Sequence, residues 1–273
     1  KFMTFTSWPG LLGELAARRE LPAESVAWAM EHIMSGEATS AQIAAFVMGL
    51  RAKGETAQDI DAMLEVMLHH ALPAHVAGVT VDTCGTGGDG AHTVNISTMA
   101  AIVVAACGLT VVKHGNRAAS SKCGSADVLE TLGVSLDAPA QRVSDIAAEC
   151  GITFFFAPMF HPALKHAGPT RREIGIPTAF NILGPLANPA RPRAQVVGVA
   201  NPVMAPIVAE VLQRRGTKAL VVRGHDGLDE LSTHTQSTVW VVLGDKVEEI
   251  TLEQIRLGDR IRVLSGEIGR AHV

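Results

Sequence analysis

The sequence predicts a small all-helical N-terminal domain followed by a larger α/β domain with a mostly parallel central sheet. Two patterns predict this division. Residues 1–72 carry their apolar side chains at helical spacing, whereas from residue 77 onward short β-branched runs alternate with helical stretches. With 47% hydrophobic and 18% charged residues, a chain of 273 residues also has enough apolar material for two cores.

The N-terminal part contains helices with recognisable boundary signals. Gly36 and Gly54 each follow an apolar stretch of helical period and are expected to end it. Thr56 and Asp59 form the pattern of a capping box ahead of a further apolar face. The predicted helices cover residues 26–34, 43–50 and 60–68. We therefore expect residues 1–72 to form a small helical bundle.

Strands and helices alternate in the remainder of the chain, and this order produces parallel strand pairs. The predicted strands cover residues 79–83, 109–113, 152–157, 195–200 and 218–223. The predicted helices cover residues 96–107, 126–132 and 206–214. Residues 238–243 and 246–251, separated by Gly244 and Asp245, have the pattern of an antiparallel hairpin.

Composition excludes several classes of protein. No apolar run reaches the ~20 residues of a membrane span. The formal net charge of −4 gives no general attraction to nucleic acid or anionic membranes. The four cysteines lie far apart and form no CxxC pair, as expected of reduced thiols. We expect a cytoplasmic protein with no nucleic-acid or membrane partner.

The segment from Thr83 to Gly90 contains four glycines directly after a predicted strand. Backbone N–H groups of such a turn approach an anion with no Cβ in the way. Gly85, Gly87 and Gly90 also satisfy the dinucleotide pattern GxGxxG, but that pattern requires an acidic residue after the second strand, which here ends in Lys113. The segment therefore indicates a different kind of phosphate site, although an ordinary tight loop remains open.

Two polar segments are expected beside this turn. Asn95–Thr98 begins the following helix, where its oxygens either cap the helix or bind phosphate or metal. Lys113–Ser121 follows the neighbouring strand and contains two cations, a histidine, an amide and two hydroxyls. Because this run is poor in acids and offers its cations no charge partners, we favour an oxyanion ligand over a solvated basic loop.

Three further segments remain ambiguous. Gly124–Asp127 opens a helix and offers its N-terminus to an anion. Asp229 and Glu230 supply the hard oxygen ligands that Mg²⁺ prefers, although an exposed acidic turn is as good an explanation. Arg171–Glu173 has the pattern of an ordinary ion pair on a helix surface. No HExxH or GxSxG pattern supports a zinc enzyme or a serine hydrolase.

In combination, six motifs resemble those of the anthranilate phosphoribosyltransferase family, in order, from about residue 8 to about residue 250. The motifs are Gly85–Asp89, Asn95–Thr98, Lys113–Arg117, Arg171–Gly175, Asn181–Leu186 and Asp226–Glu230. The resemblance implies the fold class of nucleoside phosphorylases and phosphoribosyltransferases. It also implies transfer of phosphoribose from phosphoribosyl diphosphate to anthranilate, a step of tryptophan biosynthesis. A homodimer joined through the helical domains is implied as well, with residues of about 165–190 packing back on them and substrates at the hinge.

The resemblance also implies roles for individual residues. Ser97, Asp229 and Glu230 would hold Mg²⁺, and Gly85, His114, Asn116 and Arg171 would meet anthranilate. Lys113 would stabilise the leaving diphosphate, and no covalent nucleophile is expected. The donor would contact Gly85, Gly88, Asp89, Thr93, Asn95, Ile96, Ser97, Thr98, Lys113, His114, Gly115, Asn116, Arg117, Ala118, Ala119, Ser120, Ser121 and Ser125.

The resemblance implies several more helices after the hairpin, so we expect the chain to be truncated at its C-terminus. Glu267–Val273 can be encoded by a common sequencing-adapter string, which predicts that these residues are an assembly artefact. Lys1 in place of methionine likewise predicts an incomplete or processed start. Two alternatives are a pyrimidine nucleoside phosphorylase of similar fold and a non-enzymatic relative that binds nucleic acid through a basic surface.

Overall fold

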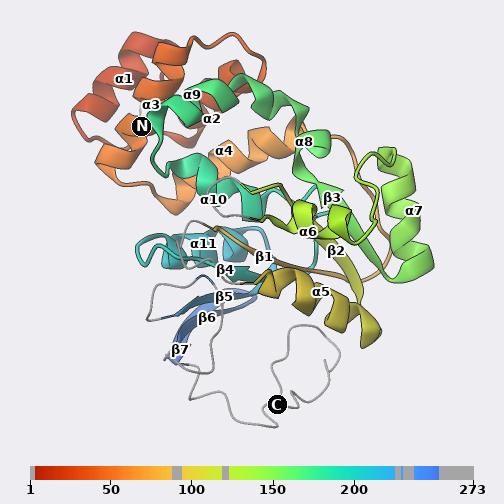
Figure 1. Cartoon of the computed structure of the whole chain (residues 1–273). Coiled ribbons are helices and arrows are strands. Elements are labelled where there is room, and N and C mark those ends of the chain that lie inside the picture. Colours follow the sequence, from red (N-terminus) through yellow and green to blue (C-terminus); the bar gives the residue numbers. More distant parts are fainter. Residues whose placement is uncertain (1–3, 88–93, 119–122, 225–228, 230–236, 252–273) are drawn as a thin grey trace. The chain divides into compact units, whose positions relative to one another are not determined.

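The computed structural model describes residues 4–87, 94–118, 123–224, 229 and 237–251. The chain divides into two compact units (Figure 1). One comprises Lys1–Pro73 and Pro158–Pro189, and the other comprises Ala74–Ala157 and Ala190–Val273. In the described part of the chain, no helix has both the length and the apolar character to cross a membrane.

The first unit is helical. Its first four helices are α1 (Trp8–Ala16), α2 (Ala23–Met34), α3 (Ser40–Lys53) and α4 (Ala57–His69). The later segment contributes η1 (Pro162–His166), α9 (Gly168–Ile174) and α10 (Ala179–Leu186), preceded by the short α8 (Ala157–Phe160). Thr56 and Asp59 form both hydrogen bonds of the predicted capping box, and Thr39 forms a second box with Gln42. Fully buried side chains such as Met30, Phe46 and Leu50 form the core of this unit.

The second unit contains a seven-stranded sheet of order β3-β2-β1-β4-β5-β6-β7. Its strands are β1 (Thr80–Gly85), β2 (Thr110–Gly115), β3 (Ile152–Phe156), β4 (Ala194–Gly198), β5 (Lys218–Gly224), β6 (Ser237–Leu243) and β7 (Lys246–Thr251). The pairs among β1 to β5 are parallel, whereas β6 and β7 are antiparallel to their neighbours. This arrangement confirms the fold class predicted from the sequence.

Helices cover both faces of this sheet. They are α5 (Ile96–Ala106), α6 (Ser125–Thr131), α7 (Ala140–Cys150) and α11 (Met204–Arg214). Figure 1 shows α5 on one side of the sheet and α11 on the other. Beneath α5, Ala101 packs with Val81, Val111 and Ala194 in a buried apolar cluster. The connections between β1 and β2 and between β4 and β5 are therefore strand–helix–strand crossovers, which place the carboxyl ends of these strands at one edge.

The central strands differ in how far their pairing extends. Pairing of β1 with β4 continues to the end of both strands, where Gly85 lies opposite Gly198. The register between β1 and β2 ends at Val81 and Val111, well before the carboxyl ends of the two strands. Beyond that point, the Asp82 and Lys113 side chains bond to backbone groups of the neighbouring strand, as described below.

The predicted strands are all present, and their ends agree with the prediction to within two residues. The sequence patterns missed α1, α7 and the short helices between residues 157 and 186. Pro9, Pro162 and Pro169 lie in the first turns of their helices, where proline is tolerated, whereas Pro185 lies inside α10. Residues 252–273, including Glu267–Val273, lie outside the described residues.

Candidate active site

The turn after β1 lies directly against Asp229. The backbone N–H of Gly87 donates a hydrogen bond of 2.7 Å to the Asp229 Oδ2 atom. A Cβ on Gly85 would lie 2.5 Å from the same oxygen, and a Cβ on Gly198 would lie 1.5 Å from the Asp229 backbone oxygen. The carboxyl ends of β1 and β4 thus end in paired glycines because Asp229 occupies the space that side chains would fill.

Lys113 connects β2 with β1 and with the first turn of α5. Its Nζ atom donates to the backbone oxygen of Thr83 at 2.7 Å and to the Ser97 Oγ atom at 3.3 Å. The Thr83 hydroxyl in turn donates to the Ser97 backbone oxygen at 2.7 Å. The Lys113 residue is only 3% exposed, so its charge lies in an environment where hydrogen bonds to it are strong.

The first turn of α5 differs in detail from the capping expected of it. The Asn95 side chain does not cap the helix; its Nδ2 atom instead donates to the Cys123 backbone oxygen at 3.4 Å. The Thr98 residue is 2% exposed, and its Oγ1 atom has no hydrogen-bond partner among the described residues. Ile96 is the first residue of α5. The Ser97 hydroxyl therefore faces Lys113, while Asn95 links this turn to the segment before α6.

A buried carboxylate, which sequence reasoning missed, lies beneath these segments. Asp82 is 1% exposed, and its Oδ1 atom accepts from the backbone N–H of His114 at 3.3 Å. Its Oδ2 atom accepts from Gln195 Nε2 at 3.4 Å. Burial, followed by the negative charge of Asp82, raises the pKa of the neighbouring Cys84 thiol well above its ordinary value. Asp82 thus ties β1 to both neighbouring strands where the ladder with β2 has ended.

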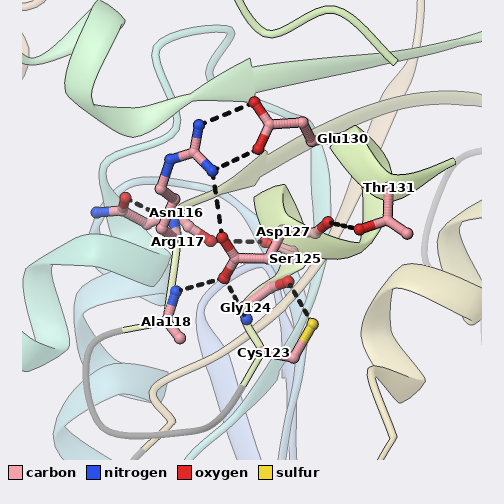
Figure 2. Close-up of polar contacts among 9 residues, drawn as sticks. All are labelled: Asn116, Arg117, Ala118, Cys123, Gly124, Ser125, Asp127, Glu130 and Thr131. Atoms are coloured by element: carbon pink, nitrogen blue, oxygen red, sulfur yellow. Dashed lines mark hydrogen bonds and ion pairs between the residues drawn. The ribbon is translucent and has the colours of Figure 1, made fainter. Parts of the chain in front are cut away.

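Arg117 has charge partners that the sequence did not suggest (Figure 2). Its guanidinium donates to both carboxylate oxygens of Glu130, at 2.6 and 3.0 Å, and to Asp127 Oδ1 at 3.3 Å. It also lies over the Phe156 ring, 5.6 Å from the centroid. The expectation of a basic loop without charge partners was wrong for Arg117, because α6 brings two acids from 10 and 13 residues further along the chain.

The start of α6, which the sequence predicts to offer its N-terminus to an anion, is capped by a carboxylate of the protein itself. The backbone N–H of Gly124 donates to Asp127 Oδ2 at 2.7 Å, so the protein's own carboxylate occupies the end of this seven-residue helix. The Ser125 hydroxyl donates to the backbone oxygen of Asn116 at 3.3 Å. Gly115 approaches this contact so closely that a Cβ there would lie 2.2 Å from Ser125 Oγ.

The residues expected to meet anthranilate are divided between the two units. Arg171 belongs to the first unit, and Gly85, His114 and Asn116 belong to the second. Within its unit, the Arg171 guanidinium lies over the Phe180 ring, 5.2 Å from the centroid. Burial lowers the pKa of Arg171, yet arginine stays charged in proteins. The Arg171 guanidinium therefore packs on an aromatic ring and is partly buried, whereas the sequence pattern suggested a solvated ion pair on a helix surface.

Part of the expected site lies outside the described residues. These positions are Gly88, Asp89, Thr93, Ala119, Ser120, Ser121 and Glu230. Among the described positions, the structure brings Gly85 together with Asp229, and Lys113 together with Ser97. Sequence reasoning missed Asp82, Gly198 and the clamping role of Asp127. A glycine within the predicted strand 195–200 was the one available signal for Gly198.

Comparisons with known proteins give matches for both parts of the chain. Residues 77–262 match the α/β domain of a glycosyl transferase family, and residues 9–71 match the helical bundle domain of a glycosyl transferase family. The anthranilate phosphoribosyltransferase of Acidothermus cellulolyticus is 59% identical over 252 residues, covering 92% of this chain and 71% of the relative. The enzyme of Saccharopolyspora erythraea is 56% identical over 252 residues, covering 92% and 72%.

Solved structures of the same enzyme have the same fold. The anthranilate phosphoribosyltransferase of Thermus thermophilus superposes with a TM-score of 0.83 and 42% identity, covering 89% of this chain and 74% of that one. The Saccharomyces cerevisiae enzyme in complex with phosphoribosyl diphosphate and Mg has a TM-score of 0.81 and 30% identity, covering 90% and 73%.

Proposed function

Because the chain belongs to the anthranilate phosphoribosyltransferase family, we infer that it transfers a phosphoribosyl group from phosphoribosyl diphosphate to anthranilate, with release of diphosphate. The observation that carries this inference is the placement of Asp229 against the glycine turn of β1, with its carboxylate 2.7 Å from the Gly87 nitrogen. An acid that follows β5 in the sequence and a phosphate-type turn after β1 thereby lie together.

The described residues fit a bound Mg²⁺. Asp229 and Ser97 offer carboxylate and hydroxyl oxygens, the donor type that this ion prefers, and Glu230 would complete the set. The Saccharomyces cerevisiae relative binds the donor together with Mg. When bound, the ion supplies positive charge against the diphosphate of the donor.

The protein residues have separate tasks in the transfer. As the bond between C1 and the diphosphate oxygen breaks, negative charge grows on the leaving group. The Lys113 ammonium and the N–H groups of the glycine turn stabilise that charge. The amine nitrogen of anthranilate forms the new bond to C1 and loses a proton. Because the uncharged aromatic amine is already nucleophilic, orientation contributes more than a strong base does.

Arg171 would hold the carboxylate of anthranilate through its planar guanidinium, with Asn116, His114 and Gly85 completing the acceptor site. The donor site would combine the β1 turn, the first turn of α5, the 113–121 run and Ser125. Charge complementarity supports this division, since the acceptor carries one carboxylate and the donor carries several phosphate oxygens. We further propose that the protein is a cytoplasmic homodimer joined through its helical domains and acts in tryptophan biosynthesis.

The direct test follows the fluorescence of anthranilate after addition of phosphoribosyl diphosphate and Mg²⁺. We expect the fluorescence to disappear, and Ser97→Ala and Asp229→Asn to require far more Mg²⁺ for the same rate. Phosphorolysis of thymidine without use of phosphoribosyl diphosphate would favour a nucleoside phosphorylase. Salt-dependent DNA binding without binding of the donor would favour a nucleic-acid-binding relative.

A further inference from the structure

A single carboxylate closes the base of the segment that joins β2 to α6 (Figure 2). Asp127 Oδ2 accepts a hydrogen bond of 2.9 Å from the backbone N–H of Ala118, where the segment leaves β2. The same oxygen accepts one of 2.7 Å from the N–H of Gly124, where the segment enters α6. These two amides are six positions apart in the sequence, yet they converge on one atom.

Arg117 holds this carboxylate from its other side. One guanidinium nitrogen donates to Asp127 Oδ1, and Glu130 grips the same guanidinium with both of its oxygens. The Phe156 ring lies against the guanidinium at the end of β3. Arg117 therefore binds Asp127 directly, while Glu130 of α6 and Phe156 of β3 hold its guanidinium in place.

The backbone at this base is packed too closely for side chains. A Cβ on Gly124 would lie 2.4 Å from the Ala118 nitrogen and 2.7 Å from the Asn116 backbone oxygen. That oxygen also accepts hydrogen bonds from the Ala126 N–H at 3.2 Å and from Ser125 Oγ at 3.3 Å. The end of β2 and the start of α6 are thus joined by hydrogen bonds as well as by close packing.

Helix capping explains only part of this arrangement. The capping box of α6 needs the bond between Asp127 and Gly124 alone. The bond to Ala118 and the ion pair with Arg117 do nothing for the ends of α6. Both of them instead fix residues of β2 and its exit, which carry part of the expected donor site.

We propose that Asp127 is a positioning residue for the phosphoribosyl diphosphate donor, which holds the exit of β2 and the start of α6 together so that their donor-binding residues face the ligand in one arrangement. This inference rests on the proposed function. It assigns to Asp127 no contact with the donor. Arg117 and Glu130 support Asp127 in this role.

The test compares Asp127→Asn with the wild type in steady-state kinetics and in calorimetric titration with phosphoribosyl diphosphate. An amide cannot satisfy both sides of the site: if its oxygen faces the two N–H groups, its NH₂ group faces Arg117, and the reverse orientation is equally unpaired. Loss of one charge-assisted bond predicts an increase of about tenfold in KM and Kd for the donor. KM for anthranilate should rise less than KM for the donor, because the Arg171 contact proposed for its carboxylate does not depend on the exit of β2.

Two further variants separate positioning from general stability. Glu130→Gln leaves the Asp127 carboxylate in place but weakens the grip on Arg117, so the donor KM should rise by about threefold. Glu149→Gln is the matched control, because the Arg142–Glu149 pair on α7 is as exposed (51% and 54%) as the Arg117–Glu130 pair (47% and 52%). The control should leave the donor KM unchanged.

The outcomes distinguish the two proposals. If the wild type neither binds nor uses phosphoribosyl diphosphate, the proposed function fails and this inference fails with it. If the wild type is active and Asp127→Asn lowers only kcat, or raises both KM values equally, Asp127 has a purely structural role. A tighter donor Kd in Asp127→Asn would mean that the carboxylate merely repels the ligand. Either of the last two results overturns the inference while leaving the proposed function intact.

Discussion

Adding one methyl group at Gly198 should displace Asp229 and inactivate the enzyme. A Cβ at this position lies 1.5 Å from the Asp229 backbone oxygen, and ordinary contact begins at 3.4 Å, so the oxygen must retreat by about 1.9 Å. The β4 backbone cannot give way instead, because it pairs with β1 and β5 on its two sides. The Gly87–Asp229 hydrogen bond of 2.7 Å would therefore break.

A misplacement of about 1 Å in an active site can cost about 100-fold in rate, so Gly198→Ala should lower kcat/KM at least ~100-fold. The assay is loss of anthranilate fluorescence over a range of Mg²⁺ concentrations. Gly13→Ala is the control, since its Cβ meets no described atom within 4 Å and a helical alanine stabilises by up to about 1 kcal/mol. Full activity of Gly198→Ala at the wild-type Mg²⁺ requirement would refute the placement of Asp229 as a functional group.

Three other measurements probe the same site and its surroundings. Lys113→Met should lower kcat/KM for the donor by about 100-fold or more, which is the scale of losing an oxyanion donor. The Kd for anthranilate should stay within about twofold of the wild-type value. Equal losses for both substrates would argue against a role of Lys113 at the leaving group. Backbone N–H bonds from Ala118 and Gly124, together with Arg117, lower the pKa of Asp127. The ionised Asp127 carboxylate therefore contributes its full share to folding stability above the ordinary pKa of 3.8. That contribution is lost as the pH falls through the lowered pKa. Urea unfolding at descending pH should therefore show a steeper acid loss of stability for the wild type than for Asp127→Asn, and parallel curves would contradict this. A thiol reagent at pH 8 should quickly label the three exposed cysteines of the native protein, which are Cys107, Cys123 and Cys150. Cys84 should react only after unfolding, because it is buried and burial raises the pKa of its thiol. Rapid labelling of Cys84 would mean that the end of β1 opens readily.

The alternation of apolar patterns determined most of the fold. Buried parallel strands appear as short β-branched runs, and the amphipathic helices between them repeat every 3.6 residues, so both could be recognised locally. Capping at Thr56 was predictable for the same reason, since its two hydrogen bonds join residues three apart. The helices of residues 157–186 were not predicted, because each spans only four to eight residues and α10 contains Pro185.

The candidate site was predictable to the extent that its chemistry is contained in contiguous motifs. Glycines after a strand, a lysine at the end of the next strand and an acidic pair after β5 indicated a phosphate-binding edge. This inference was possible because ligands of open α/β sheets bind beyond the carboxyl ends of the strands. Which of these groups pair with each other was a different matter.

Only the tertiary structure decided those pairings. Asp229 reaches the Gly87 amide from 142 positions away, and Asp82 accepts from Gln195 across 113 positions. The partners of Arg117 were also decided by the fold. The sequence suggested that its positive charge faces a ligand, and in the structure its guanidinium forms ion pairs with Asp127 and Glu130. The physical reason is that a hydrogen bond or ion pair depends on separation in space, and separation in space is set by sheet order and helix packing rather than by distance along the chain.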